Sequence, residues 1–130
     1  MSSLQWLATT AVFTALLWIP YVLERLTALG VWASLSNPTE ADLTAQSDWA
    51  KRARRAHANA IENLVVMATL VLVANATHKA DGLVATATLT YFVARVVHFA
   101  GHTAKLPAVR TLAFAVCFVA QLAVAWAILS

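Results

Sequence analysis

Four long apolar segments account for most of this chain, at residues 4–29, 54–77, 83–101 and 109–129. The first has no charged residue before Glu24, and residues 4–23 would form a helix about 30 Å long, which matches the hydrocarbon core of a bilayer. Because a segment in lipid must satisfy its own backbone, each span is expected to be helical, with a kink at Pro20. The sequence predicts an all-α, integral membrane four-helix bundle with up-down topology, as one domain over residues 1–130.

The composition supports lipid as the surroundings of this chain. Of its 130 residues 61% are hydrophobic and 12% are charged, which is more apolar surface than a soluble core of this size could bury. The net charge is +3, but the basic residues lie between the apolar segments, which argues against nucleic acid as a partner. The first segment lacks the basic lead-in of a cleavable signal peptide. Cys117 lies in an apolar run and is expected to be a buried, unreactive side chain.

The distribution of Lys and Arg predicts the orientation in the membrane. The first connection and its flanks hold Arg25, Lys51, Arg52, Arg54 and Arg55. The third connection holds Lys105 and Arg110, whereas the second holds only Lys79. Since cytoplasmic loops carry the excess of positive charge, both termini are expected to face away from the cytoplasm.

A stripe of polar residues opens the second apolar segment. Arg55, Asn59 and Glu62 are spaced i, i+4, i+7 and therefore share one helix face, with Asn63 beside them and His57 pointing nearly the opposite way. Such residues cost about 2.5–3.5 kcal/mol each in a span, so they indicate function. We expect the stripe to point into the protein, where the arginine could bind a carboxylate and the glutamate an ammonium, which suits a zwitterionic, amide-rich ligand. The alternative is a structural Arg55–Glu62 salt bridge.

A second stripe ends the third segment and consists of Tyr91, Arg95, His98 and His102, with Lys105 close to it. We interpret it as the cationic lining of a site. His98 and His102 are also spaced i, i+4 as zinc ligands can be, but no cysteine is nearby and three cations would repel a metal, so we predict no metal. Arg95 could instead pair with Glu62 across the bundle.

Arg110 opens the fourth segment near the same membrane face as Arg55. A half-buried arginine there would favour an anion such as a thiolate, because neighbouring cations lower the pKa of a thiol. An interfacial arginine that only marks the cytoplasmic side is the alternative.

These motifs resemble the MAPEG family, the membrane-associated proteins of eicosanoid and glutathione metabolism. The run Arg55-Ala56-His57-Ala58-Asn59-Ala60-Ile61-Glu62 is similar to the signature of its second helix. Further matches are Arg95-Val96-Val97-His98, followed by Lys105-Leu106 and Arg110, and the loop Asn37-Pro38-Thr39-Glu40. With the four spans and the length, the resemblance covers essentially the whole chain. The short, Ala-rich form looks like a bacterial member, which implies the inner membrane.

The resemblance implies a homotrimer of four-helix subunits that binds glutathione at subunit interfaces near the cytoplasmic face. The expected activity is a glutathione-dependent transferase or peroxidase acting on lipophilic small molecules. Arg55, Asn59 and Glu62 would hold the glutathione backbone, His57 would reach the site of the neighbouring subunit, and Arg110 would stabilise the thiolate. The remaining residues assigned to the cofactor-binding site are Asn63, Arg95, His98 and His102.

Two other functions stay open from the sequence. One is a non-enzymatic lipid-binding or scaffold protein of the same family. Asn63 and His102 fit it, since both stand where glutathione-dependent relatives often carry tyrosine. The other is a small four-span exporter that uses Glu62 as its membrane-embedded carboxylate.

Overall fold

A computed structural model describes residues 1–37 and 39–130, so Pro38 of the loop motif lies outside the described residues. The helices are α1 Ser3–Leu16, α2 Ile19–Leu29, α3 Val31–Leu35, α4 Glu40–Ala45, α5 Asp48–Ala76, α6 Gly82–Thr103 and α7 Pro107–Leu129. Four stretches are long and apolar enough to cross a membrane, namely Ser3–Leu29, α5, α6 and α7. The all-α fold class and the four membrane-length helices predicted from the sequence are confirmed.

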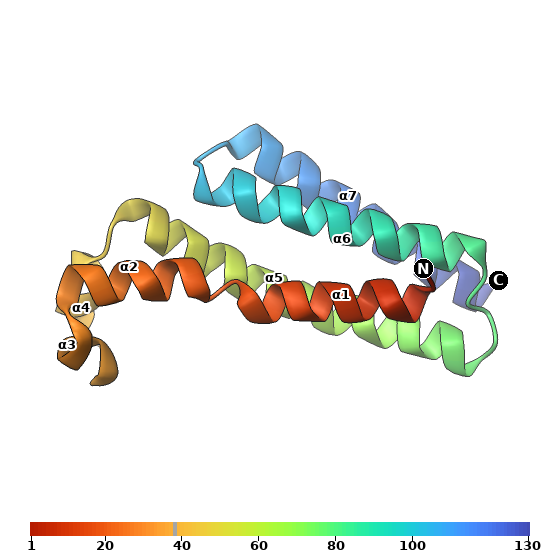
Figure 1. The fold of residues 1–130 in the computed structure, drawn as a ribbon. Helices are drawn as coiled ribbons and strands as arrows, with labels where there is room; N and C mark the ends of the chain where they lie inside the picture. The colour runs from red at the N-terminus through yellow and green to blue at the C-terminus, as the bar shows by residue number, and fades with distance from the viewer. Residues whose placement is uncertain (38) are drawn as a thin grey trace.

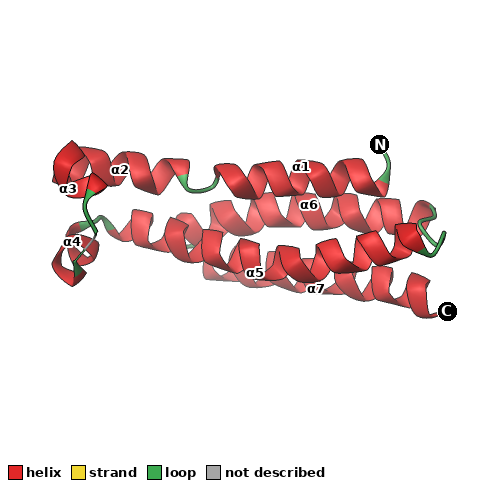
Figure 2. Cartoon of the chain, turned by 90° about the horizontal axis from the view of Figure 1, so that it is seen from below, coloured by secondary structure: helices red, strands yellow, loops and turns green. Residues whose placement is uncertain are grey.

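Helices α5 and α6 pack against each other, and the other two long stretches pack on this pair. Both α1 and α7 contact this pair, from different sides (Figures 1 and 2). The core between them includes Met67, Val71, Tyr91 and Val124, and also Cys117, which is buried as expected. Both termini lie at the same end of the bundle as the turn between α5 and α6, and α3 and α4 lie at the other end (Figure 1).

The first span is broken into two helices, and the kink expected at Pro20 is present. Proline has no N–H, and its ring would clash with the carbonyl of Leu16, four residues earlier, where α1 ends. Helix α1 ends in a tightened turn, because the N–H of Leu17 donates to the carbonyl of Thr14, three residues earlier, at 3.2 Å. After the break the chain changes neighbours, since α1 packs on α5 and α6 whereas α2 packs on α5, α3 and α4.

Helix α5 begins at Asp48, six residues before residue 54, near which the apolar part of the second span was expected to start. Its first turns are polar and so fall outside an apolar window, but they bury Ala50 and Ala53 and carry Asp48 where the helix dipole favours a carboxylate. The connection before it is also more ordered than predicted, since it contains α3 and α4.

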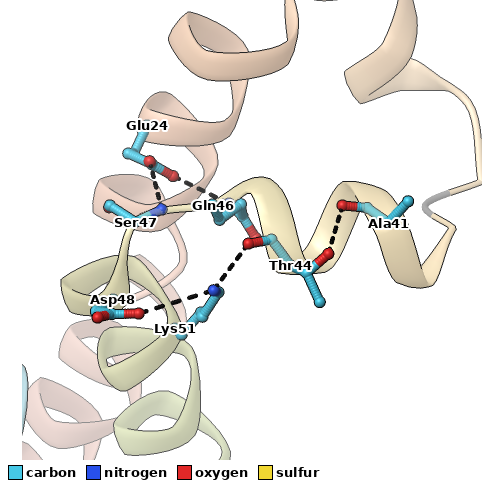
Figure 3. Close-up of polar contacts among 7 residues, drawn as sticks. All are labelled: Glu24, Ala41, Thr44, Gln46, Ser47, Asp48 and Lys51. Atoms are coloured by element: carbon cyan, nitrogen blue, oxygen red, sulfur yellow. Dashed lines mark hydrogen bonds and ion pairs between the residues drawn. The ribbon is translucent and has the colours of Figure 1, made fainter.

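Glu24 of α2 holds the start of α5 (Figure 3). Its carboxylate accepts the N–H of Ser47 at 2.9 Å and the side-chain amide of Gln46 at 3.2 Å. Ser47 occupies the N-cap position of α5 without a side-chain capping bond, and Glu24 from another helix satisfies the N–H of Ser47, one of the free amides at this helix start. This contact fixes where the basic first turns of α5 lie.

A small capping motif opens α4. The hydroxyl of Thr39 accepts the N–H of Asp42, and the Asp42 carboxylate accepts both the N–H and the hydroxyl of Thr39 at 2.8 Å. Hydrogen bonds from the Thr39 backbone and then from its side chain lower the pKa of Asp42 below its ordinary value.

The turn between α6 and α7 brings these helices into close contact. Lys105 adopts φ +62°, and the N–H of Leu106 donates to the carbonyl of Gly101 at 2.8 Å, a helix-ending pattern that usually employs glycine at the left-handed position. A Cβ on Gly101 would lie 2.9 Å from Cγ1 of Val109 and 3.3 Å from the backbone nitrogen of Arg110. A glycine at position 101 therefore allows the first turn of α7, with Val109 and Arg110, to lie this close to α6.

Candidate functional site

Two adjoining pockets lie between α5, α6 and α7. The inner pocket, of ≈ 290 Å³, is lined by Asn59, His98, His102, Arg110, Thr111 and Phe114. The outer pocket, of ≈ 460 Å³, is lined by Arg52, Arg55, Gly101, His102, Lys105, Leu106, Pro107 and Arg110. We call the two pockets together the cationic site, because His102 and Arg110 line both and no acidic side chain lines either. The arrangement suits an anionic ligand.

Arg95 is buried beneath the inner pocket, with 2% of its surface exposed. Its Nη1 donates to Oδ1 of Asn59 on α5 at 2.9 Å. Its guanidinium carbon also lies 5.2 Å from the centre of the Tyr91 ring and 6.0 Å from that of Phe114. Nε and Nη2 have no hydrogen-bond partner among the described residues, so this buried guanidinium has N–H groups without an acceptor.

His98 and His102 follow Arg95 along α6 and belong to the cationic site. Their ring centres are 5.6 Å apart and the rings are nearly perpendicular, at 85°. Nδ1 of His102 is buried without a partner in the part of the chain that is described. No group of three His, Cys, Asp or Glu side chains that could hold a metal ion occurs among the described residues, so the zinc alternative lacks a third ligand.

The expectation that the first stripe points into the protein was wrong for two of its three members. Arg55 and Glu62 are exposed in the single chain, and only Asn59 is partly buried. The face of α5 that packs inward carries Ala56 and Ala60, and Glu62 lies about 200° around the helix from Ala60. Arg55 still lines the outer pocket, whereas Glu62 lines neither pocket.

Neither structural salt bridge considered from the sequence is formed. Among the described residues the one ion pair is Lys51–Asp48, at 3.8 Å and separated by less than one helical turn. Glu62 therefore pairs with neither Arg55 nor Arg95 in the part of the chain that the structure describes.

His57 and Asn63 lie apart from the cationic site in this chain. Nδ1 of His57 is 2.8 Å from the hydroxyl of Tyr21 on α2, which agrees with the opposite helical direction derived from the sequence. The side-chain amide of Asn63 donates to the carbonyl of Asn59 at 2.9 Å and so turns back on its own helix. The Asn63 carbonyl accepts the amide of Gln121 on α7 at 3.2 Å.

Sequence reasoning did not assign Arg52, Thr111 and Phe114 to a site. Arg52 lines the outer pocket, and its Nε donates to the carbonyl of Thr103 at 3.0 Å, which ties the start of α5 to the end of α6. It lies three residues before Arg55, so extending the stripe by one turn would have found it. Thr111 and Phe114 had no such signal, because their place depends on how α7 packs.

Comparison with known proteins gives one positive result. The family model described as MAPEG family matches residues 3–130, and thus includes all seven helices and every residue of the cationic site. A search of the curated proteins finds no match for this chain.

Proposed function

The chain belongs to the MAPEG family, and from that premise we propose that it is a glutathione-dependent transferase or peroxidase acting on lipophilic electrophiles. Family membership and the four apolar helices make it an integral membrane protein. The observation that carries the proposal is the cationic site, where three arginines, a lysine and two histidines line adjoining pockets without a carboxylate. Glutathione, with two carboxylates and one ammonium, is a net anion, and its thiol ionises more readily beside cations.

The donors of the cationic site fit this ligand. The side-chain oxygen of Asn59 accepts a hydrogen bond from Arg95. The side-chain nitrogen of Asn59 would therefore be the group that donates into the inner pocket, which Asn59 lines. Nδ1 of His102 and two nitrogens of Arg95 are buried without partners among the described residues. Buried donors of this sort are expected to be satisfied by a bound group. A peptide carboxylate or carbonyl would supply the missing acceptors.

Each side chain has a distinct part in the proposal. Bound glutathione would supply the nucleophilic thiol. Arg110, which lines both pockets, would stabilise negative charge on the sulfur, and Arg55 and Lys105 would bind carboxylates in the outer pocket. The Phe114 ring, which lines the inner pocket, would supply an apolar wall beside the sulfur.

The exposed polar residues of α5 support a homotrimer as the working assembly. Glu62 faces outward in a membrane-length helix, where an isolated carboxylate is costly, and a neighbouring subunit would cover it. In that assembly Glu62 would meet the ammonium of glutathione and His57 would serve the neighbouring site. Lys and Arg are in excess at the end of the bundle that holds the cationic site. This excess favours a cytoplasmic position of the cationic site, in a bacterial inner membrane, with both termini on the opposite side.

Binding is tested with two neighbouring arginines. Arg55 lines the outer pocket, whereas Arg54, also exposed, lines only a separate pocket beside α4 that Arg55 borders as well. We expect Arg55→Gln to weaken glutathione binding by about tenfold or more, as measured by calorimetry on the detergent-purified protein, because a charge-assisted hydrogen bond is lost. Arg54→Gln should leave the affinity nearly unchanged. Absence of glutathione binding by the unaltered protein would overturn the proposal.

Turnover separates the enzyme from a second candidate, a non-enzymatic lipid-binding or scaffold protein. Asn63 favours that candidate, since its amide is engaged by its own helix and donates nothing to the cationic site. With a chlorodinitrobenzene-type substrate, the enzyme should show activity that Arg110→Gln lowers by about 100-fold, the usual loss for one electrostatic donor. Glutathione binding without turnover would instead support the scaffold.

A further inference from the structure

An apolar groove runs along α6 and α7 on a face that the cationic site does not use. It consists of two pockets, of ≈ 580 and ≈ 410 Å³, that share Thr90, Leu112 and Val116 and therefore form one channel. We call it the α6–α7 groove. It extends from Val97 near the α6–α7 turn to Leu83 at the other end of α6.

The groove exists because small side chains alternate with large ones along this face. Ala94 and Ala113 lie at its floor and are almost fully buried, whereas Leu112 and Val93 form exposed walls. The hydroxyl of Thr86 at its far part donates to the carbonyl of Gly82 at 2.8 Å and is thus satisfied within α6. The lining is almost purely apolar, so water is a poor occupant.

The dimensions suit an extended hydrocarbon chain. The α6 lining of the first pocket from Leu89 to Val97 rises about 12 Å, and the second pocket continues it past Thr90. From Leu83 to Val97 the groove is about 21 Å long, which is more than half of a hydrocarbon core of about 30 Å.

The charge around the groove selects the kind of lipid. The sequence has no Asp or Glu after Asp81, so the α6–α7 hairpin carries no negative side chain. Its exposed cations, Lys105 and Arg110, line the outer pocket of the cationic site and lie at or beside the turn where the groove ends near Val97 and Val109. Positive charge at the end of an apolar channel attracts an anionic headgroup. We propose that the α6–α7 groove binds one acyl chain of an anionic phospholipid, with its headgroup beside Lys105.

The test is native mass spectrometry of the full chain in detergent, titrated with phosphatidylglycerol. Saturable binding of one lipid per chain is expected. Thr90→Phe places a ring where the two pockets join, at an exposed position that the fold tolerates, and should weaken binding by about tenfold or more. Val96→Phe, an exposed residue of α6 outside the groove, is the matched control and should change the affinity by less than about twofold.

The headgroup is tested with phosphatidylcholine of the same acyl chains. The protein should prefer phosphatidylglycerol, and Lys105→Asn should remove the preference, since asparagine keeps the left-handed backbone and loses the charge. Equal binding of phosphatidylglycerol by the protein and its Thr90→Phe variant would overturn the proposal. So would loss of subunit association in Thr90→Phe, because the groove would then be an interface between copies. Glutathione calorimetry on Thr90→Phe should match that of the unaltered protein, which keeps the two proposals separate.

Discussion

Arg95 on α6 donates through Nη1 to Oδ1 of Asn59 on α5, at 2.9 Å. This bond determines which side of the Asn59 amide faces the inner pocket. The oxygen is held by the arginine, so the nitrogen on the other branch of the amide remains as a donor. Arg95 does not line the inner pocket itself, but it orients Asn59, which does.

The Arg95–Asn59 bond predicts that stability and ligand binding can be separated at Asn59. In Asn59→Asp the carboxylate still accepts Arg95 but loses the amide donor, so thermal stability in detergent should be retained while glutathione affinity falls by about tenfold or more. In Asn59→Ala both should fall, with about 1.5–3 kcal/mol lost from the free energy of unfolding. Normal glutathione binding by Asn59→Asp would show that the amide nitrogen does not contact the ligand.

The close approach at Gly101 predicts a steric effect on the site. In Gly101→Ala the new methyl would lie 2.9 Å from Cγ1 of Val109, so α7 must shift, at a cost of about 1–3 kcal/mol in unfolding free energy. Since Arg110 follows Val109, activity should fall as well. Gly82→Ala is the control, because a Cβ there meets nothing within 4 Å, and it should leave the melting temperature unchanged or raise it. Equal melting curves for the two variants would contradict the packing described for this turn.

The Glu24 contact predicts that α2 stabilises the start of α5 (Figure 3). Glu24→Ala leaves the N–H of Ser47 without its acceptor, and the loss of this cap should cost about 1–2 kcal/mol. Hydrogen exchange of the backbone amides at residues 47–51 should speed up accordingly. Glu40→Ala, at an exposed position of α4, is the matched control and should leave that exchange unchanged. Unaltered exchange in Glu24→Ala would mean that α5 needs no support from α2.

The capping motif of α4 predicts a pH dependence confined to that helix. The pKa of Asp42 is lowered in the folded protein, first by the Thr39 backbone N–H and then by its hydroxyl. A lowered pKa stabilises the fold above the ordinary value of 3.8, and this contribution is lost as pH falls through the folded value. Nuclear magnetic resonance in micelles should therefore show α4 loosening only in strong acid. In Asp42→Asn that dependence should vanish, and an unchanged acid transition would assign it to another group.

The sequence was sufficient to predict the four membrane-length helices and the residues that violate their hydrophobicity, but not the short helices α3 and α4. Apolar length fixed the four spans, since lipid leaves no other way to satisfy the backbone, and helical spacing grouped Tyr91, Arg95 and His98 on one buried stripe. The start of α5 was missed because its buried contacts are alanines among charged residues, which no hydropathy window detects.

What the sequence alone determined is thus a membrane protein with polar groups placed at regular helical intervals. Only the tertiary structure decided which of them meet. Spacing gives a direction around one helix, but not the rotation of that helix against its neighbours, and packing of small residues sets that rotation. Burial of Ala56 and Ala60 turned Glu62 outward, and the glycine at position 101 brought Arg110 beside His102. The cationic site therefore depends on helix packing. Its charged side chains can act together only at the short distances that the folded bundle creates.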